Sequence, residues 1–221
     1  MDATQLMVRG VVVGVFQENC YIIGSRQSGE AICFDPGDEV DEIRALAREM
    51  RMRITRIVCS HAHLDHIMAV RALKEETGAP FLLHQEDLEL ARQMPASALA
   101  MLGRREQPAP DPDAFLADGD DVEIPGISMK VLHTPGHTRG SICLYGGGML
   151  FSGDTLFNGS IGRTDLPGGS YPQIMDSILT RLMELPDETI VRPGHMEQTT
   201  IGAERRANPF VLQELDRRQT R

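Results

Sequence analysis

Hydrophobic and polar positions alternate in short runs along the first part of the chain. From Leu6 to Phe34, β-branched residues recur between turn residues, which predicts a meander of strands. The period then changes to that of a helix, with Asp38 as a candidate N-cap. The apolar positions of this helix are Val40, Ile43, Ala47 and Met50. The run from Ile54 to Cys59 predicts the next strand, so a helix interrupts a β-rich pattern.

The middle of the chain continues with helical and extended segments. A helical spacing from Ile67 to Leu73 ends near Gly78, and the run from Phe81 to His84 predicts a short strand. Two further helical stretches are expected before Gly103. The segment from Gly103 to Asp113 carries three prolines between polar residues, which predicts a surface loop or lid.

Strands dominate the second half. Four runs separated by glycine-rich turns predict strands, namely Val122 to Ile124, Ile127 to Leu132, Ile142 to Tyr145 and Met149 to Ser152. Ser170 to Gln173 resembles a capping box that opens a helix, and Thr189 to Arg192 predicts a last strand before a helical tail. This α/β pattern is typical of two packed sheets with helices outside, although other α/β layouts share it.

Length, composition and charge restrict the class of protein. With 221 residues, 41% of them hydrophobic, the chain suits one compact domain over residues 1–221. Its formal charge of −10 argues against nucleic acid as a partner. The longest apolar stretch, Gly10 to Phe16, is shorter than the ~20 residues of a membrane span and is a poor signal peptide. We therefore predict a cytoplasmic protein without membrane contact.

The cysteines and methionines are interpreted as packing residues and indicate no further site. The four cysteines stand alone in strand-like segments, so we expect buried thiols in a reducing compartment. One of them, Cys59, adjoins a histidine cluster but is interpreted as a packing residue. The twelve methionines are assigned to the core.

Histidines and aspartates gather where predicted strands end. The first cluster runs from Ser60 to His66 and holds three histidines and one aspartate, which is costly to bury in a core. A second cluster runs from His133 to Thr138, a third contains Asp154, and a fourth contains His195. If these strand ends meet at one rim, the side chains suit zinc, iron or manganese.

The order of these motifs resembles the metallo-β-lactamase superfamily. The chain reads H-x-H-x-D-H, then T-P-G-H-T, then G-D-T and finally G-H. The segment from Phe151 to Phe157, followed by G-S-I-G-R-T-D, is similar to a compact glyoxalase II-like branch. The resemblance implies an αββα sandwich of two mixed β-sheets with flanking helices and a site for two divalent metal ions at one edge.

The resemblance also implies a role for each matching residue. The first ion would be bound by His61, His63 and His137, and the second by Asp65, His66 and His195. Asp154 matches the ligand that bridges them, and Asp65 and Asp154 are the candidate catalytic residues. We expect zinc, with iron or manganese as alternatives. Ser60 and Thr138 are candidates for orienting ligands, although hydroxyls that stabilise turns are commoner. His84 and His133 are interpreted as non-ligands, and His133 either supports a ligand or forms a hydrogen bond within its turn.

The activity implied is thioester hydrolysis by a hydroxide that bridges the two metals. The expected substrate is S-D-lactoylglutathione or a related hydroxyacyl thioester, a small anionic molecule. Arg163 is the candidate residue for binding a substrate carboxylate, and a structural ion pair with Asp165 is the alternative. Met68 and Met196 stand where the family commonly has glycine, so we expect a different pocket shape.

The same residues are compatible with other functions. A mononuclear-iron persulfide dioxygenase of the same superfamily would use the equivalents of His61, His137 and Asp154. A lactonase would use the same hydroxide, and a metal-binding scaffold without activity is a fourth reading. A zinc β-lactamase is disfavoured because Asp154 stands where those enzymes usually have cysteine, and a flavodiiron protein because His63 stands where they have glutamate.

Overall fold

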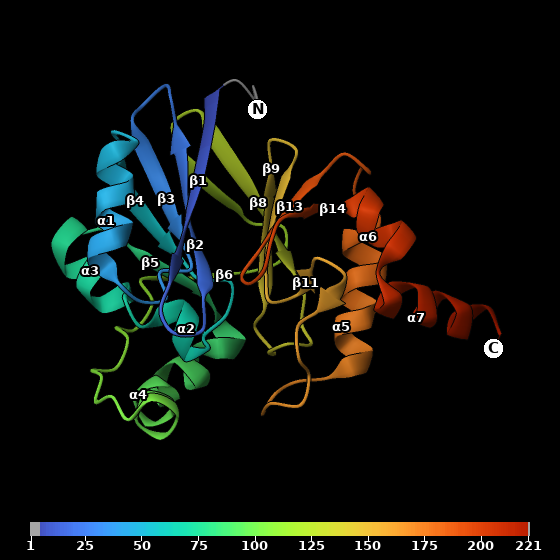
Figure 1. Cartoon of the computed structure of the whole chain (residues 1–221). Helices are drawn as coiled ribbons and strands as arrows, with labels where there is room; N and C mark the ends of the chain where they lie inside the picture. Colours follow the sequence, from blue (N-terminus) through green and yellow to red (C-terminus); the bar gives the residue numbers. More distant parts are fainter. Residues whose placement is uncertain (1–4, 221) are drawn as a thin grey trace.

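Two β-sheets lie face to face, with helices on both outer sides (Figure 1). The computed structural model describes residues 5–220. The first sheet has the order β1 (Leu6–Val13), β2 (Glu18–Ser25), β3 (Glu30–Phe34), β4 (Arg53–Val58), β5 (Phe81–His84) and β6 (Ala114–Leu116). Its strands pair antiparallel from β1 to β3 and parallel from β3 to β6. The meander predicted at the start of the chain is confirmed.

The second sheet comes from the second half of the chain. Its order is β14 (Thr199–Thr200), β13 (Ile190–Pro193), β10 (Met149–Gly153), β9 (Ile142–Gly146), β8 (Ile127–His133) and β7 (Asp121–Ile124). The strands β10 and β13 run parallel, and the other neighbours run antiparallel. A small hairpin of β11 (Leu156–Phe157) and β12 (Ser160–Ile161) follows β10.

Helices cover the outer face of each sheet. On the first sheet lie α1 (Val40–Glu49), α2 (Leu64–Ile67), α3 (Val70–Thr77), the 3-10 turn η2 (Gln85–Asp87) and α4 (Leu88–Leu102). On the second lie α5 (Tyr171–Ser177), the π-helical turn η3 (Ile178–Leu182), α6 (Ile201–Ala207) and α7 (Pro209–Gln219). In Figure 1, α1 and α3 flank one side, α5 and α6 flank the other, and α2 and α4 lie at one end of the sheets.

Three hydrophobic clusters separate the four layers. Neighbouring residues of one strand belong to different clusters, because successive side chains point to opposite faces. On β2, Ile22 packs toward the helices and Ile23 toward the other sheet. On β10, Phe151 packs between the sheets and Leu150 beneath the second helical layer. This confirms the αββα sandwich of two mixed sheets.

Several local predictions are wrong. Asp38 does not cap α1, whose N-cap is Glu39 in a left-handed conformation; Asp38 binds the Arg104 guanidinium. Ser170 occupies the N-cap of α5, but its side chain makes no capping hydrogen bond. The two helical stretches expected before Gly103 are the turn η2 and the single long helix α4. The short strands β6, β11, β12 and β14 were not predicted.

The burial predicted for the cysteines is confirmed, whereas that predicted for the methionines is not. All four cysteines are free and buried, as predicted. Met101 and Met196, however, are each 59% exposed, so the assignment of every methionine to the core is wrong. Within residues 5–220, no helix has both the length and the apolar character that a membrane span requires.

Candidate metal centre

Four loops at one edge of the two sheets carry the predicted ligands. Residues 59–66 follow β4 of the first sheet, and His63 is the N-cap of α2. The other three loops follow β8, β10 and β13 of the second sheet and carry His137, Asp154 and His195. The sandwich therefore brings together side chains that are far apart in the sequence.

Three imidazole nitrogens meet at the first position. His61 Nε2 lies 3.0 Å from His63 Nδ1 and 3.2 Å from His137 Nε2, and the third side of the triangle, from His63 Nδ1 to His137 Nε2, is 2.8 Å. Nitrogens bound to one tetrahedral zinc ion are roughly 3.3 Å apart. The three histidines thus have a spacing close to that of metal ligands.

The second group lies beside the first, and Asp154 stands between them. His195 Nε2 is 3.3 Å from Asp65 Oδ2, and His66 Nε2 is 4.0 Å from the same oxygen. Asp154 Oδ1 is 3.4 Å from His66 Nε2, while its Oδ2 is 3.5 Å from His137 Nε2 and 3.6 Å from His195 Nε2. One carboxylate therefore faces both groups.

The protonation pattern of the ring nitrogens fits bound cations. His137 donates its Nδ1 proton to the Arg163 carbonyl at 2.8 Å, which selects the neutral tautomer with a lone pair on Nε2. The Ser60 hydroxyl donates to Asp35 and therefore accepts from His61 Nδ1, which leaves a lone pair on His61 Nε2 as well. Two lone pairs that converge within a buried site need a cation or a hydrogen-bond donor between them, and an ion bound by His61, His63 and His137 would satisfy both.

Orphaned polar atoms in the second group point the same way. His66 Nε2 and Asp154 Oδ1 are buried and have no hydrogen-bond partner among residues 5–220. Buried polar atoms are almost always paired, and a metal ion is one recognised reason for an exception. The donor set of imidazoles and carboxylates therefore fits divalent ions such as zinc, iron or manganese.

Electrostatics keep three of the candidate ligands in forms that can bind metal, whereas the carboxylates around His66 favour a proton on its ring in the absence of a metal. Burial lowers the pKa of His61 well below its ordinary value and that of His63 to about 3, so both rings are neutral at pH 7. Burial raises the pKa of the Asp154 carboxyl, but the neighbouring His66 outweighs this and holds it below its usual range. Burial also lowers the pKa of His66, but Asp154 and Asp35 raise it well above the usual value, which marks a position that attracts positive charge.

Two buried carboxylates that the sequence analysis missed support the ligand loops. Asp35 accepts hydrogen bonds from the Ser60 backbone N–H at 2.6 Å and the Ser60 hydroxyl at 2.8 Å, and it lies 3.1 Å from His66 Nδ1. It therefore orients His61 through Ser60 and faces His66 directly. The sequence carries one signal for a special role of Asp35, which follows a predicted strand and precedes the turn residues Pro36-Gly37.

Asp87 connects the first ligand loop to the second. Its Oδ2 accepts from the Ala62 N–H at 2.9 Å and the Thr138 hydroxyl at 2.8 Å, and its Oδ1 accepts from the Gly140 N–H at 2.7 Å. The side chain is 1% exposed, so water does not replace these bonds. The Thr138 hydroxyl thus helps to fix the second loop by its hydrogen bond to Asp87. Nothing in the sequence distinguishes Asp87 from the acidic residues around it.

The loop that carries His195 is held by β2. Asn19 Nδ2 donates to the carbonyls of Pro193 at 3.0 Å and Met196 at 2.9 Å, and the Asn19 backbone N–H donates to Gly194. The Tyr21 hydroxyl also donates to the Pro193 carbonyl, at 2.9 Å. These bonds fix the turn on both sides of His195.

Replacing Asn19 by aspartate is expected to weaken metal binding at the second position by about tenfold, because loss of such supporting bonds costs ~10–100-fold in metal affinity. The new carboxylate oxygen would face two carbonyl oxygens and repel them. Calorimetric metal titration measures the effect. Asn158→Asp is the matched control, since Asn158 makes one long bond of 3.4 Å at the surface. Equal metal affinity in the two variants would contradict this role for Asn19.

The remaining predicted residues lie at or beyond the edge of the centre. A cavity of about 410 Å³ opens over His63, Asp65, His137, Asp154 and His195, and Arg163 contributes to its lining. The Arg163 guanidinium is bound bidentately by Asp165, at 2.8 and 2.7 Å. His84 and His133 stack on each other with ring centroids 4.1 Å apart and lie outside this cavity.

Comparisons with known proteins identify the family. A model of the metallo-beta-lactamase superfamily matches residues 13–195, and the chain belongs to this superfamily of metallo-hydrolases. Within it, the chain is similar to the hydroxyacylglutathione hydrolase GloC of Haemophilus influenzae, with 35% identity over 91% of this chain and 96% of that protein. The resemblance inferred from the motifs is confirmed.

Several solved structures share this fold. The BLEG-1 B3 metallo-beta-lactamase is 35% identical, with a TM-score of 0.87 and coverage of 93% of this chain and 99% of that one. TTHA1623 in a di-iron-bound form is 39% identical, with a TM-score of 0.83 over 91% and 99% of the two chains. ETHE1 from Myxococcus xanthus is 31% identical, with a TM-score of 0.78 over 92% and 83%.

Proposed function

We propose that this protein is a metal-dependent thioester hydrolase that acts on S-D-lactoylglutathione or a related hydroxyacyl thioester. The observation that carries the proposal is the place of Asp154, whose carboxylate faces both ligand groups at the floor of an open cavity. The similarity to a relative named hydroxyacylglutathione hydrolase supports the substrate class. The four buried free thiols fit the reducing cytoplasm, which we propose as its location.

The residues divide the chemistry among them. Two divalent ions, with zinc expected and iron or manganese as alternatives, would supply Lewis acidity and lower the pKa of water when bound. His61, His63 and His137 would hold the first ion, Asp65, His66 and His195 the second, and Asp154 both. Asp65 and Asp154 offset part of the positive charge, which leaves a site that favours an anionic substrate. A thiolate with a pKa of ~8.5 leaves without a general acid, so no further catalytic group is needed.

Arg163 remains the proposed contact for a substrate carboxylate, at the mouth of the cavity. It can make this contact by exchanging Asp165 for the substrate, since both side chains are more than half exposed. Arg163→Ala is expected to raise KM several-fold with kcat nearly unchanged, because such a contact binds ground state and transition state alike. Steady-state kinetics checks this, and an unchanged KM would leave Arg163 with a structural ion pair alone.

The proposed function is tested by the initial rate of S-D-lactoylglutathione hydrolysis by metal-replete protein under nitrogen. We expect rapid, oxygen-independent release of glutathione, and addition of a chelator should abolish it. The absence of hydrolysis under these conditions, with both metal positions filled, would overturn the proposal.

A persulfide dioxygenase is the second candidate, which the similarity to ETHE1 favours. His61, His137 and Asp154 also lie together, with His137 Nε2 3.2 Å from His61 Nε2 and 3.5 Å from Asp154 Oδ2. This trio would suffice for one iron, but it leaves Asp65 and His195 without a role. Oxygen uptake with glutathione persulfide on iron-loaded protein would select this candidate, and hydrolysis of a lactone or a cephalosporin would select the corresponding hydrolase.

A further inference from the structure

The walls of the cavity over the metal centre are apolar. Its floor is formed by the ligands, whereas its sides come from the turn after β1, from α2 and α4, and from the segment that contains β11 and β12. The apolar side chains in these walls are Phe16, Leu64, Met101, Phe157, Ile161, Leu166 and Met196. A volume of about 410 Å³ is within the range of small-molecule sites.

Two apolar residues of the walls are largely exposed to solvent. Met101 on α4 and Met196 beside His195 are each 59% exposed, yet both line this one cavity. Met196 also has a φ of 70°, a left-handed conformation that is unfavourable for a side chain with a Cβ. The bond from Asn19 to the Met196 carbonyl holds it there. Exposed apolar groups that converge on a cavity indicate a ligand that covers them.

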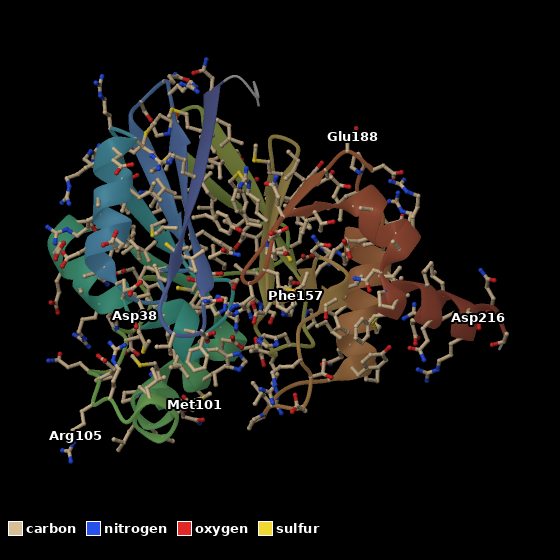
Figure 2. All side chains as sticks on the ribbon, in the orientation of Figure 1. Asp38, Met101, Arg105, Phe157, Glu188 and Asp216 are labelled. Carbon is tan, nitrogen blue, oxygen red and sulfur yellow. The ribbon has the colours of Figure 1, made fainter. Side chains whose placement is uncertain are left out.

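Positive charge is scarce around the same cavity. Arg163 is the one arginine or lysine among its lining residues within the described part of the chain, and Asp165 already binds it. The neighbouring Arg105 lines a different hollow with Arg71 and Met68, and Figure 2 shows it extending away from Met101 and Phe157. The cavity can therefore pair one substrate carboxylate at its mouth, and its walls above the floor of ligands offer little to a polar group.

We propose that, among the thioesters this protein hydrolyses, the cavity favours those with a longer unbranched apolar acyl chain over the lactoyl group. The chain would lie against Met101, Met196 and Phe157, with the scissile carbonyl over the ligands and the polar thiol toward Arg163 and solvent. This inference rests on the proposed thioester hydrolysis and ranks its acyl groups by chain length. Burying each methylene against such walls favours the longer substrate.

The test uses acyl thioesters of one thiol, namely acetyl-, butyryl-, hexanoyl- and S-D-lactoylglutathione. We expect kcat/KM to rise about threefold per added methylene, and lactoyl to fall below butyryl. The double variant Met101→Gln with Met196→Gln keeps side-chain length and helix propensity but should flatten this series. Leu99→Gln is the matched control, because Leu99 is 51% exposed on the same helix and lies outside the cavity.

Binding of non-hydrolysable thioethers separates this inference from the proposed function. Calorimetry with S-methyl-, S-butyl- and S-hexylglutathione should show affinity rising with chain length in the native protein and the Leu99 variant, and not in the double methionine variant. Hydrolysis combined with length-independent affinity and kcat/KM would overturn the selectivity alone. Graded thioether affinity without hydrolysis of any thioester would overturn the proposed hydrolase while supporting an apolar cavity.

Discussion

Replacing Asp154 by alanine is expected to lower kcat/KM for thioester hydrolysis by about a thousandfold or more, because one carboxylate serves both ligand groups. Its Oδ1 and Oδ2 lie 3.4 to 3.6 Å from His66, His137 and His195, so no other side chain can take its place without moving a loop. The variant should also bind less metal. Steady-state kinetics and metal analysis of the purified variant measure both effects.

The control for this prediction is a carboxylate far from the centre. Asp121 pairs with Lys130 on the β7–β8 hairpin, and Asp121→Ala should leave both rate and metal content unchanged. Full activity of the Asp154 variant with an unchanged metal content would contradict the model of a shared bridging ligand.

Replacing Asp87 by asparagine is expected to lower the free energy of unfolding by roughly 3 kcal/mol, because the buried carboxylate accepts three hydrogen bonds and the amide can accept at only one atom. The new NH₂ group would face a backbone N–H, either that of Ala62 or that of Gly140. Both ligand loops would then shift relative to each other. Urea denaturation of the metal-free protein measures the stability change without a contribution from metal binding.

A second aspartate provides a matched comparison. Asp113 also accepts a backbone N–H, from Phe81 at 2.7 Å, but it is 42% exposed and pairs with Lys74 at the surface. Water can replace its bonds, so Asp113→Asn should cost well under half as much. Similar losses in the two variants would show that burial of Asp87 contributes nothing beyond its hydrogen bonds.

The layered fold and the order of ligand clusters could be predicted from the sequence because both are periodic or local signals. Apolar positions repeat with the period of strands and helices, and the histidines fall directly after strands. The structure brings His61, His63, Asp65, His66, His137, Asp154 and His195 together, while their assignment as metal ligands stays a prediction. The role of Arg163 toward substrate also remains a prediction.

The supporting residues could not be predicted, because their function depends on tertiary burial. Asp35 and Asp87 are single carboxylates in the sequence, and their importance appears only when donors from distant loops meet them. Asp38 failed as a cap because Arg104, which is far along the chain, binds it instead. Methionine is usually a core residue, so the sequence predicts that Met101 and Met196 are buried. Both line an open cavity instead and remain exposed.

The division of the ligand loops between the two sheets has a consequence for folding kinetics. His61 and His63 belong to the first sheet and His137 to the second, so neither donor group is complete until the sheets have docked. Contacts of such large sequence separation carry a high loop-closure cost, so we expect them to form late in folding. We therefore expect that ions bound there would act mainly after the rate-limiting step, slowing unfolding and leaving the refolding rate nearly unchanged. Bound metal would thus slow the opening of the sandwich and would not direct its assembly.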